Sequence, residues 1–139
     1  MSRGRAAGLA LAVLVLAAGC VYYPMVTDLG GVRLMPTKGR VVRAGAGALF
    51  YAEIDSTGKF GDTLVHAETP IAHRVQLVDA RGAPLPRLAV PPVSLVRLAP
   101  GAPHIVLAEL TRPLRPGEVV IVTLVFEKTG AVGVISAVE

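Results

Sequence analysis

Five side chains of this 139-residue chain are the candidate ligands for a soft or borderline metal ion: His66, His73, His104, Met25 and Met35. Imidazole nitrogen binds several transition-metal ions, and thioether sulfur favours the softer ones. His66 and His73 flank a predicted turn, so antiparallel strands could bring them together, but the sequence does not fix which face each one occupies. One hypothesis is therefore a three-histidine or methionine-assisted site. The alternative, which we favour, leaves His66 and His73 exposed and packs His104 at the head of a strand.

The only cysteine is a candidate for lipid attachment. Arg3 and Arg5 precede an apolar run at 9–16, and the small residues Ala17-Ala18-Gly19 stand directly before Cys20. The run is shorter than the roughly 20 residues that span a bilayer, and this order is typical of a bacterial lipoprotein signal. We predict a signal peptide over 1–19 and a lipidated tether over 20–40, where glycine and proline interrupt every periodicity. The protein would then be held on a membrane by its lipid, in the bacterial cell envelope, facing the periplasm or the cell exterior.

Charge and composition exclude a nucleic-acid partner. Removal of the two arginines of the signal leaves twelve basic against ten acidic residues, a formal net charge of +2. The basic residues are scattered singly and only 4% of the chain is aromatic, whereas nucleic-acid binding needs a basic patch and stacking side chains.

Catalytic motifs are absent from the sequence. The chain has no G-x-S-x-G elbow, no H-E-x-x-H pair and no phosphate-binding loop, which are the local patterns that position a nucleophile, a zinc ion or a phosphate. Asp55 and Asp62 are expected to form turns rather than a catalytic pair. We therefore predict that the protein is not an enzyme.

Short β-prone runs separated by glycine, proline and aspartate predict an all-β fold. The expected strands are Val41–Ala44, Ala48–Ile54, Thr63–Glu68, His73–Val78, Val93–Leu98, His104–Leu110, Val119–Phe126 and Ala131–Val138. Eight strands suit a Greek-key β-sandwich. The run Val119–Phe126 is apolar at both odd and even positions, so we expect it to be covered on both faces or to lie at the centre of a sandwich. The proline-dense segment 83–92 is expected to be an irregular excursion or an edge, because proline donates no ladder hydrogen bond.

Several segments occur in an order that is similar to a known family. They are Ala48–Ile54, Gly61–Val65, Ile71–Leu77, Leu98–Leu107, Pro113–Gly117 and Val122–Glu127. In this order they resemble the periplasmic copper chaperone family PCuAC, from about Val41 to the end of the chain. The resemblance implies a cupredoxin-like β-sandwich domain over 41–139.

The copper site that the resemblance implies consists of a histidine, a later methionine and a His-x-Met pair. His104 matches the histidine of the pair, but Val106 stands at its methionine, Val78 stands at the first histidine, and the segment after Val78 contains no methionine. One ligand of four remains. We therefore expect that the family site is mostly lost and that the protein has no resident cofactor. Copper is the one metal that the resemblance implies.

Two functions remain open. The first is a cell-envelope lipoprotein that keeps the sandwich as a binding or structural module. The second is an active copper chaperone that delivers copper to an accepting envelope protein through a relocated site built from His66, His73, Met25 or Met35.

Overall fold

The computed structural model describes residues 31–139. The predicted signal peptide, Cys20 and Met25 lie outside the described residues. The described chain contains no helix, and hence none that could cross a bilayer.

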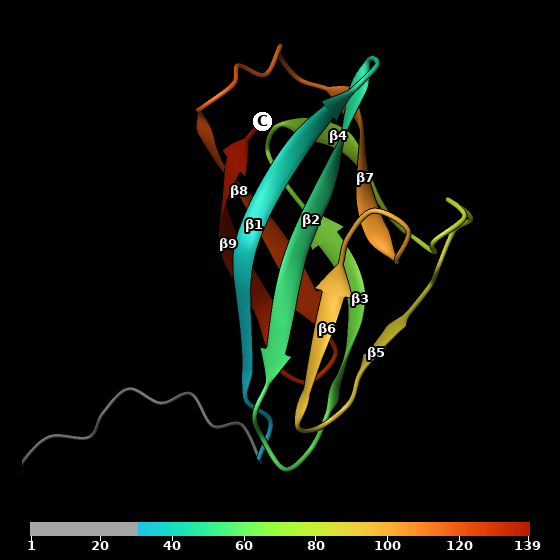
Figure 1. Cartoon of the computed structure of the whole chain (residues 1–139), viewed down its shortest axis with the longest axis vertical. Helices are drawn as coiled ribbons and strands as arrows, with labels where there is room; N and C mark the ends of the chain where they lie inside the picture. The colour runs from blue at the N-terminus through green and yellow to red at the C-terminus, as the bar shows by residue number, and fades with distance from the viewer. Residues whose placement is uncertain (1–30) are drawn as a thin grey trace, which may run out of the picture.

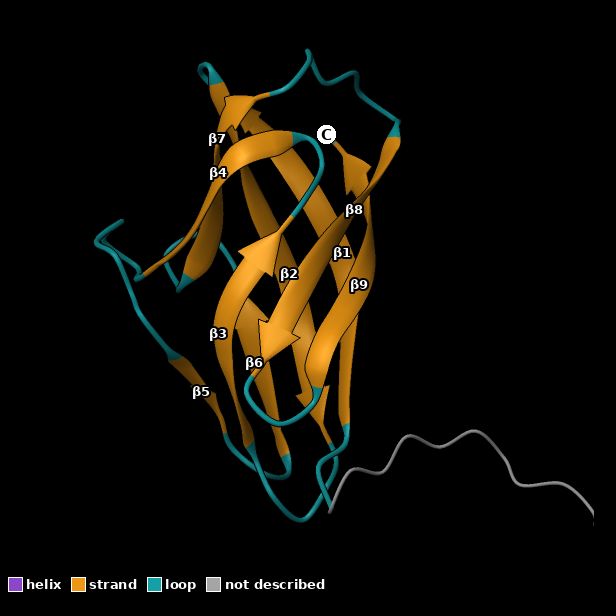
Figure 2. Cartoon of the chain, turned by 180° about the vertical axis from the view of Figure 1, so that it is seen from behind, coloured by secondary structure: helices purple, strands orange, loops and turns teal. Residues whose placement is uncertain are grey.

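In residues 31–139, nine strands form one curled sheet that closes into two facing layers (Figures 1 and 2). Their order in the sheet is β4-β7-β2-β1-β9-β8-β3-β5, and β6 pairs with β2 beyond the end of β7. All pairs are antiparallel except β1 with β9. The strands are β1 Leu34–Ala44, β2 Gly47–Ser56, β3 Asp62–Glu68, β4 Ala72–Val78, β5 Leu88–Val90, β6 Ser94–Leu98, β7 His104–Leu110, β8 Val119–Phe126 and β9 Gly130–Val138.

The core lies between the two layers and takes alternate residues from each long strand, as the period of two in a strand requires. Its largest fully buried members are aromatic and aliphatic: Phe50, Phe126, Ile54, Leu64, Leu98, Ile105, Leu107 and Leu124. The predicted all-β fold is thus confirmed, and each expected strand is present.

Strand β1 begins at Leu34, inside the segment expected to be an irregular tether. The sheet accommodates the residues that suggested irregularity. Pro36 lies just before a register shift in the pairing with β2. Gly39 lies so close to β9 that a Cβ there would be 2.5 Å from the hydroxyl oxygen of Ser136. Glycine at this position permits the parallel approach of β1 and β9.

The expectation that Val119–Phe126 is covered on both faces is wrong. One face of β8 is buried, with Val122 and Leu124 at 0% exposure, whereas Val119 and Ile121 on the other face are 63% and 52% exposed. Among residues 31–139, the part of the curled sheet that faces β8 lies on its core side, and the other side of β8 stays exposed at Val119 and Ile121.

The proline-dense segment contains the short strand β5, so the second of the two expectations for it, an edge, is the one that the structure shows. Strand β5 pairs with β3 over three residues at the edge of the sheet. No proline lies within Leu88–Val90, so the pairing of β5 with β3 loses no ladder hydrogen bond.

Candidate functional site

Four side chains form a line across the outer face of β4, β7, β2 and β1. Val78 pairs with His104, and Arg40 pairs with Tyr51. Tyr51 lies beside His104 because Ala48–Phe50, directly before it on β2, pair with β7. The centroids of the Tyr51 and His104 rings are 5.9 Å apart. We call Val78, His104, Tyr51 and Arg40 the outer row. It brings together residues from strands that are far apart in sequence.

His104 is half-buried and its ring is oriented by a backbone contact. The Nδ1 atom lies 2.9 Å from the carbonyl oxygen of Ala102. Because a carbonyl oxygen can only accept, Nδ1 donates, and the neutral ring has its free lone pair on Nε2. One imidazole nitrogen is thus available for a ligand at this point of the outer face.

The positions around His104 supply no soft ligand. Val106 lies two residues further along β7, on the same face, where it is flanked by Gln76 on β4 and Leu49 on β2. Val78, directly opposite His104, is only 3% exposed. The side chains beside the imidazole are therefore aliphatic, apart from the amide of Gln76 and the phenol of Tyr51.

The outer row also carries a fixed positive charge. The Arg40 guanidinium carbon lies 4.9 Å from the centroid of the Tyr51 ring, a cation–π arrangement. The same guanidinium lies 3.4 Å from a carboxylate oxygen of Glu139. A hollow of about 250 Å³ beside Tyr51 is lined by Lys38, Arg40, Arg97 and a single carboxylate, Glu53, together with apolar residues. Like charges repel, so this surface disfavours a metal cation.

His66 and His73 line one shallow hollow of about 290 Å³, between β3 and β4. Both are exposed. Glu68 lines the same hollow, and its carboxylate oxygen is 3.4 Å from His66 Nε2. The structure thus places two imidazoles and one carboxylate around the same space. They do not form a metal-binding group, and residues 31–139 contain no group of three His, Cys, Asp or Glu side chains able to hold a metal.

Met35 lies apart from both places. It pairs with Asp55, four residues along β2 from Tyr51, and is 62% exposed. Met25 and Cys20 fall outside the described residues. The sequence analysis missed Tyr51 and Arg40, because only the pairing of β1, β2 and β7 places them beside His104.

Three solved structures share the fold. The copper-bound PCuAC domain from PmoF2 has a TM-score of 0.70 and 24% sequence identity, and the match covers 86% of this chain and 98% of that one. The apo PCuAC domain from PmoF1 has a TM-score of 0.67 and 29% identity, over 81% and 96% of the two chains. The Cu(I) form of DR1885 from Deinococcus radiodurans has a TM-score of 0.64 and 24% identity, over 82% and 81%.

A family model also matches residues 28–138, under the description "Putative lipoprotein LpqE-like". A search of curated proteins gave no match. The structural matches confirm the resemblance to PCuAC domains that the order of segments indicated.

Proposed function

The chain belongs to the LpqE-like family, and we propose that it is a lipid-anchored protein of the bacterial cell envelope whose PCuAC-like domain has lost most of the Cu(I) site. In this proposal the domain serves as a binding or structural module, facing the periplasm or the cell exterior. The observation that carries the proposal is the outer row, where the imidazole of His104 lies between Val78 and Tyr51.

The chemistry of the outer row supports this loss. Cu(I) selects thioether and imidazole ligands, and a His-x-Met pair presents both on one face because residues two apart in a strand share that face. Here the pair is His104 and Val106. The valine has no lone pair, Val78 has none either, and the Arg40 charge faces Tyr51 beside the imidazole.

A competition assay with a chromogenic Cu(I) chelator tests the loss. The protein is the full chain with Cys20→Ser, which leaves no thiol to bind copper. We expect it to yield Cu(I) to the chelator as readily as a peptide with isolated histidines does, and His104→Ala to change nothing. Submicromolar retention of Cu(I) that His104→Ala abolishes would overturn the proposal. His73→Ala is the matched control for loss of one exposed imidazole.

A second candidate is an active copper chaperone with a relocated site, which would pass copper to an accepting envelope protein. The hollow that His66, His73 and Glu68 share favours it, with Met25 as the added sulfur ligand, since Met35 lies apart from this hollow. If Cu(I) is retained and the His66→Ala, His73→Ala double variant loses it while His104→Ala does not, this candidate replaces the first.

Anchoring is tested separately. The sequence Ala17-Ala18-Gly19-Cys20 and the match to the LpqE-like family support lipidation of Cys20. Two acyl chains give stable anchoring because each buried methylene adds ~0.8 kcal/mol. The Cys20→Ser variant should leave the membrane fraction, and its intact mass should lack the acyl groups. Membrane retention of that variant would contradict lipidation.

A further inference from the structure

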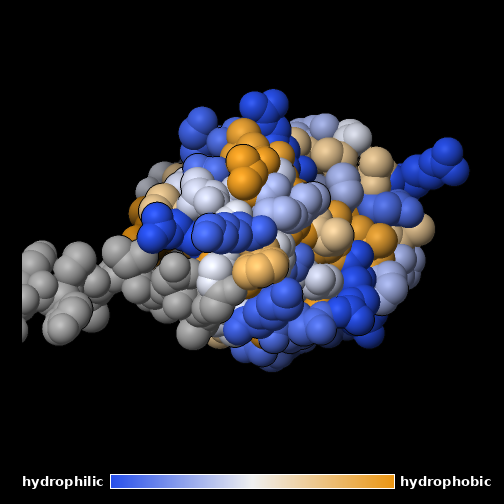
Figure 3. All heavy atoms as spheres, turned by 90° about the horizontal axis from the view of Figure 1, so that it is seen from below, coloured by the Kyte–Doolittle hydropathy of each residue, from blue (hydrophilic) through white to orange (hydrophobic). Residues whose placement is uncertain are grey.

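Three segments meet at the end of the sandwich where the described chain begins. Backbone N–H groups of Thr57 and Phe60 donate to the carbonyls of Arg33 and Gly31, at 3.1 Å each. A Cβ on Gly61 would lie 2.3 Å from the carbonyl oxygen of Val90, so the β5–β6 loop is in direct contact as well. We call the residues 31–33, 57–61 and 90–93 the entry end. Figure 3 shows this end from below, with apolar surface among hydrophilic side chains.

Two large apolar side chains project from the entry end. Phe60 is 57% exposed and Val93 is 80% exposed. Val93 has a φ of 48°, in the left-handed region that β-branched residues rarely adopt. A strained backbone that holds an apolar side chain in solvent points to a use for that side chain.

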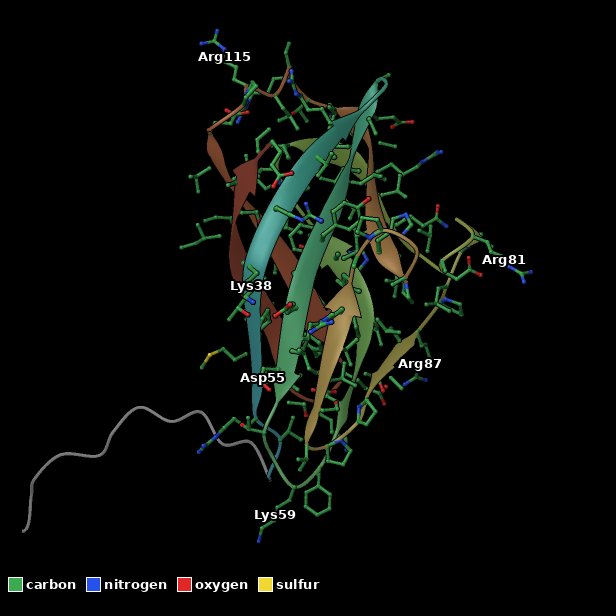
Figure 4. The ribbon with its side chains drawn as sticks, in the orientation of Figure 1. Lys38, Asp55, Lys59, Arg81, Arg87 and Arg115 are labelled. Carbon is green, nitrogen blue, oxygen red and sulfur yellow. The ribbon has the colours of Figure 1, made fainter. Side chains whose placement is uncertain are left out.

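Basic side chains surround this apolar pair. Arg33 and Lys59 belong to the entry end and are exposed, and Lys59 lies at its tip (Figure 4). Lys128 is exposed on the β8–β9 turn, and its ammonium nitrogen is 3.4 Å from the carbonyl oxygen of Gly61. The combination of apolar tips and cations is typical of proteins that sit on anionic lipid.

Within residues 31–139, the carboxylates near the entry end form no ion pair with Arg33, Lys59 or Lys128. Asp62 is buried and accepts hydrogen bonds from the backbone of Lys128 and Thr129. Glu127 forms an ion pair with Arg87. Asp55 lies above Lys59, on the side of the sandwich (Figure 4).

The position of the predicted anchor selects a lipid surface as the occupant. Cys20 lies eleven residues before Gly31, so at ~3.6 Å per residue it is within about 40 Å of the entry end. The eleven residues of β1 span about 36 Å toward the opposite end, where Arg115 lies (Figure 4). A membrane that holds Cys20 is therefore separated from the entry end, which includes Phe60, by eleven residues of chain. The opposite end is separated from it by the whole of β1 as well.

We propose that the entry end docks on the membrane that holds the lipid anchor. Phe60 and Val93 insert at the boundary between headgroups and acyl chains, and Arg33, Lys59 and Lys128 lie against anionic phosphates. This inference rests on the proposed lipidation of Cys20. It fixes the orientation of the domain, with the outer row on the side of an upright sandwich and accessible to other envelope proteins.

The chain contains no tryptophan, so a single introduced tryptophan reports the environment of one position. The test uses Phe60→Trp and Val93→Trp in the lipidated full chain, reconstituted in phosphatidylglycerol-rich vesicles that contain phospholipid brominated near the headgroup. We expect a blue-shifted emission and strong quenching at both positions. The matched control is Ile135→Trp, which replaces an aliphatic side chain that is 73% exposed. Position 135 lies five residues along β9 from Gly130, about 17 Å away from this end, and should emit as in solvent.

Each outcome decides the proposal. Unquenched emission at 60 and 93, or equal quenching at 60, 93 and 135, overturns it, and quenching at 135 alone shows that the domain lies on its side. Lys59→Gln in the Phe60→Trp chain should reduce insertion about fivefold, the effect of one cation at an anionic surface. Vesicles of neutral phosphatidylcholine should weaken insertion further than Lys59→Gln does, because all three cations then lose the anionic surface. Quenching that does not depend on lipid charge would remove the cations from the proposal.

A separate arm distinguishes this inference from the proposed anchoring. Intact-mass analysis first establishes whether Cys20 carries acyl chains. If it does not, the anchoring proposal fails, and the same tryptophan variants are held on nickel-chelating vesicles by a histidine tag in place of residues 1–20. Quenching at position 60 on such vesicles supports an intrinsic lipid-binding end. Its absence there overturns the inference irrespective of the natural anchor.

Discussion

Val78 and His104 lie directly opposite each other in the antiparallel pairing of β4 and β7, so their side chains leave the same face of the sheet. Opposed residues in such a pair have Cβ atoms about 4.5–5.5 Å apart. Two imidazoles at these positions could therefore share one ion. In this chain a valine that is 3% exposed occupies one of them.

The first prediction concerns restoration of copper binding. Val106→Met alone should not raise Cu(I) affinity, because the sulfur gains only one imidazole partner. Val78→His with Val106→Met places two imidazoles and one thioether on one face. This double variant should raise the Cu(I) affinity about tenfold or more, because mutation of even an outer-shell partner of a metal changes its affinity by that factor. Chelator competition measures both. The control is Val119→Met with Ile121→His, a Met-x-His pair on the exposed face of β8, away from His104. Equal binding by the control and the Val78→His, Val106→Met variant would contradict the geometric argument.

The second prediction distinguishes the two faces of β8. Leu124 is 0% exposed and Ile121 is 52% exposed. Leu124→Ala should lower the free energy of unfolding by about 2–5 kcal/mol, through lost burial and the cavity that remains. Ile121→Ala should change it by about 1 kcal/mol or less, the range of strand propensity at an exposed position. Urea denaturation followed by circular dichroism measures both values. Similar losses would indicate that both faces are covered in solution.

The third prediction concerns pH. Burial is the largest influence on Asp62 and raises its pKa, but the hydrogen bonds from Thr129, Lys128 and Thr63 together outweigh burial, so the pKa lies below the ordinary value. A lowered folded-state pKa stabilises the protein above the unfolded-state pKa, and this contribution is lost as the pH falls through the folded-state pKa.

Asp62→Asn should therefore lower stability at neutral pH by about 1–3 kcal/mol, because the amide accepts fewer of these bonds and its NH₂ faces donors. As the pH falls from about 5 toward 2, the native chain should lose this advantage and the two Tm values should converge. Asp55→Asn, at an exposed position, serves as the control for the removal of one carboxylate. A pH-independent difference for Asp62→Asn would show that the charge of Asp62 contributes nothing.

The fourth prediction concerns the glycine that joins two loops of the entry end. A Cβ on Gly61 would lie 2.3 Å from the carbonyl oxygen of Val90, which is backbone and cannot rotate away. Gly61→Ala should therefore cost about 1–3 kcal/mol, the usual cost of overpacking. Gly133→Ala is the matched control, because its Cβ would meet only Ile121 Cγ2 at 3.4 Å. Thermal unfolding compares the two, and a Gly61→Ala chain as stable as Gly133→Ala would contradict the close packing of these loops.

The sequence determined the local structure of this protein. Alternation and turn residues located the strands, including β7, and the period of two in that strand placed His104 and Val106 on one face before any pairing was known. The same reasoning showed that no methionine follows His104 at that spacing. These conclusions depend on contacts within a few residues, which the side chains themselves determine.

The tertiary structure decided which strands meet and which faces are covered. Val78, Tyr51 and Arg40 join His104 only through the pairing of β4, β7, β2 and β1. The exposed face of β8 carries apolar residues of the kind that a covered strand would have. It is exposed because the sheet curls toward the other face of β8. His66 and His73 share a hollow although β3 and β4 are not paired. Pairing between distant strands is selected by the burial summed over the whole sheet, and a single segment of sequence carries only a small part of that free energy.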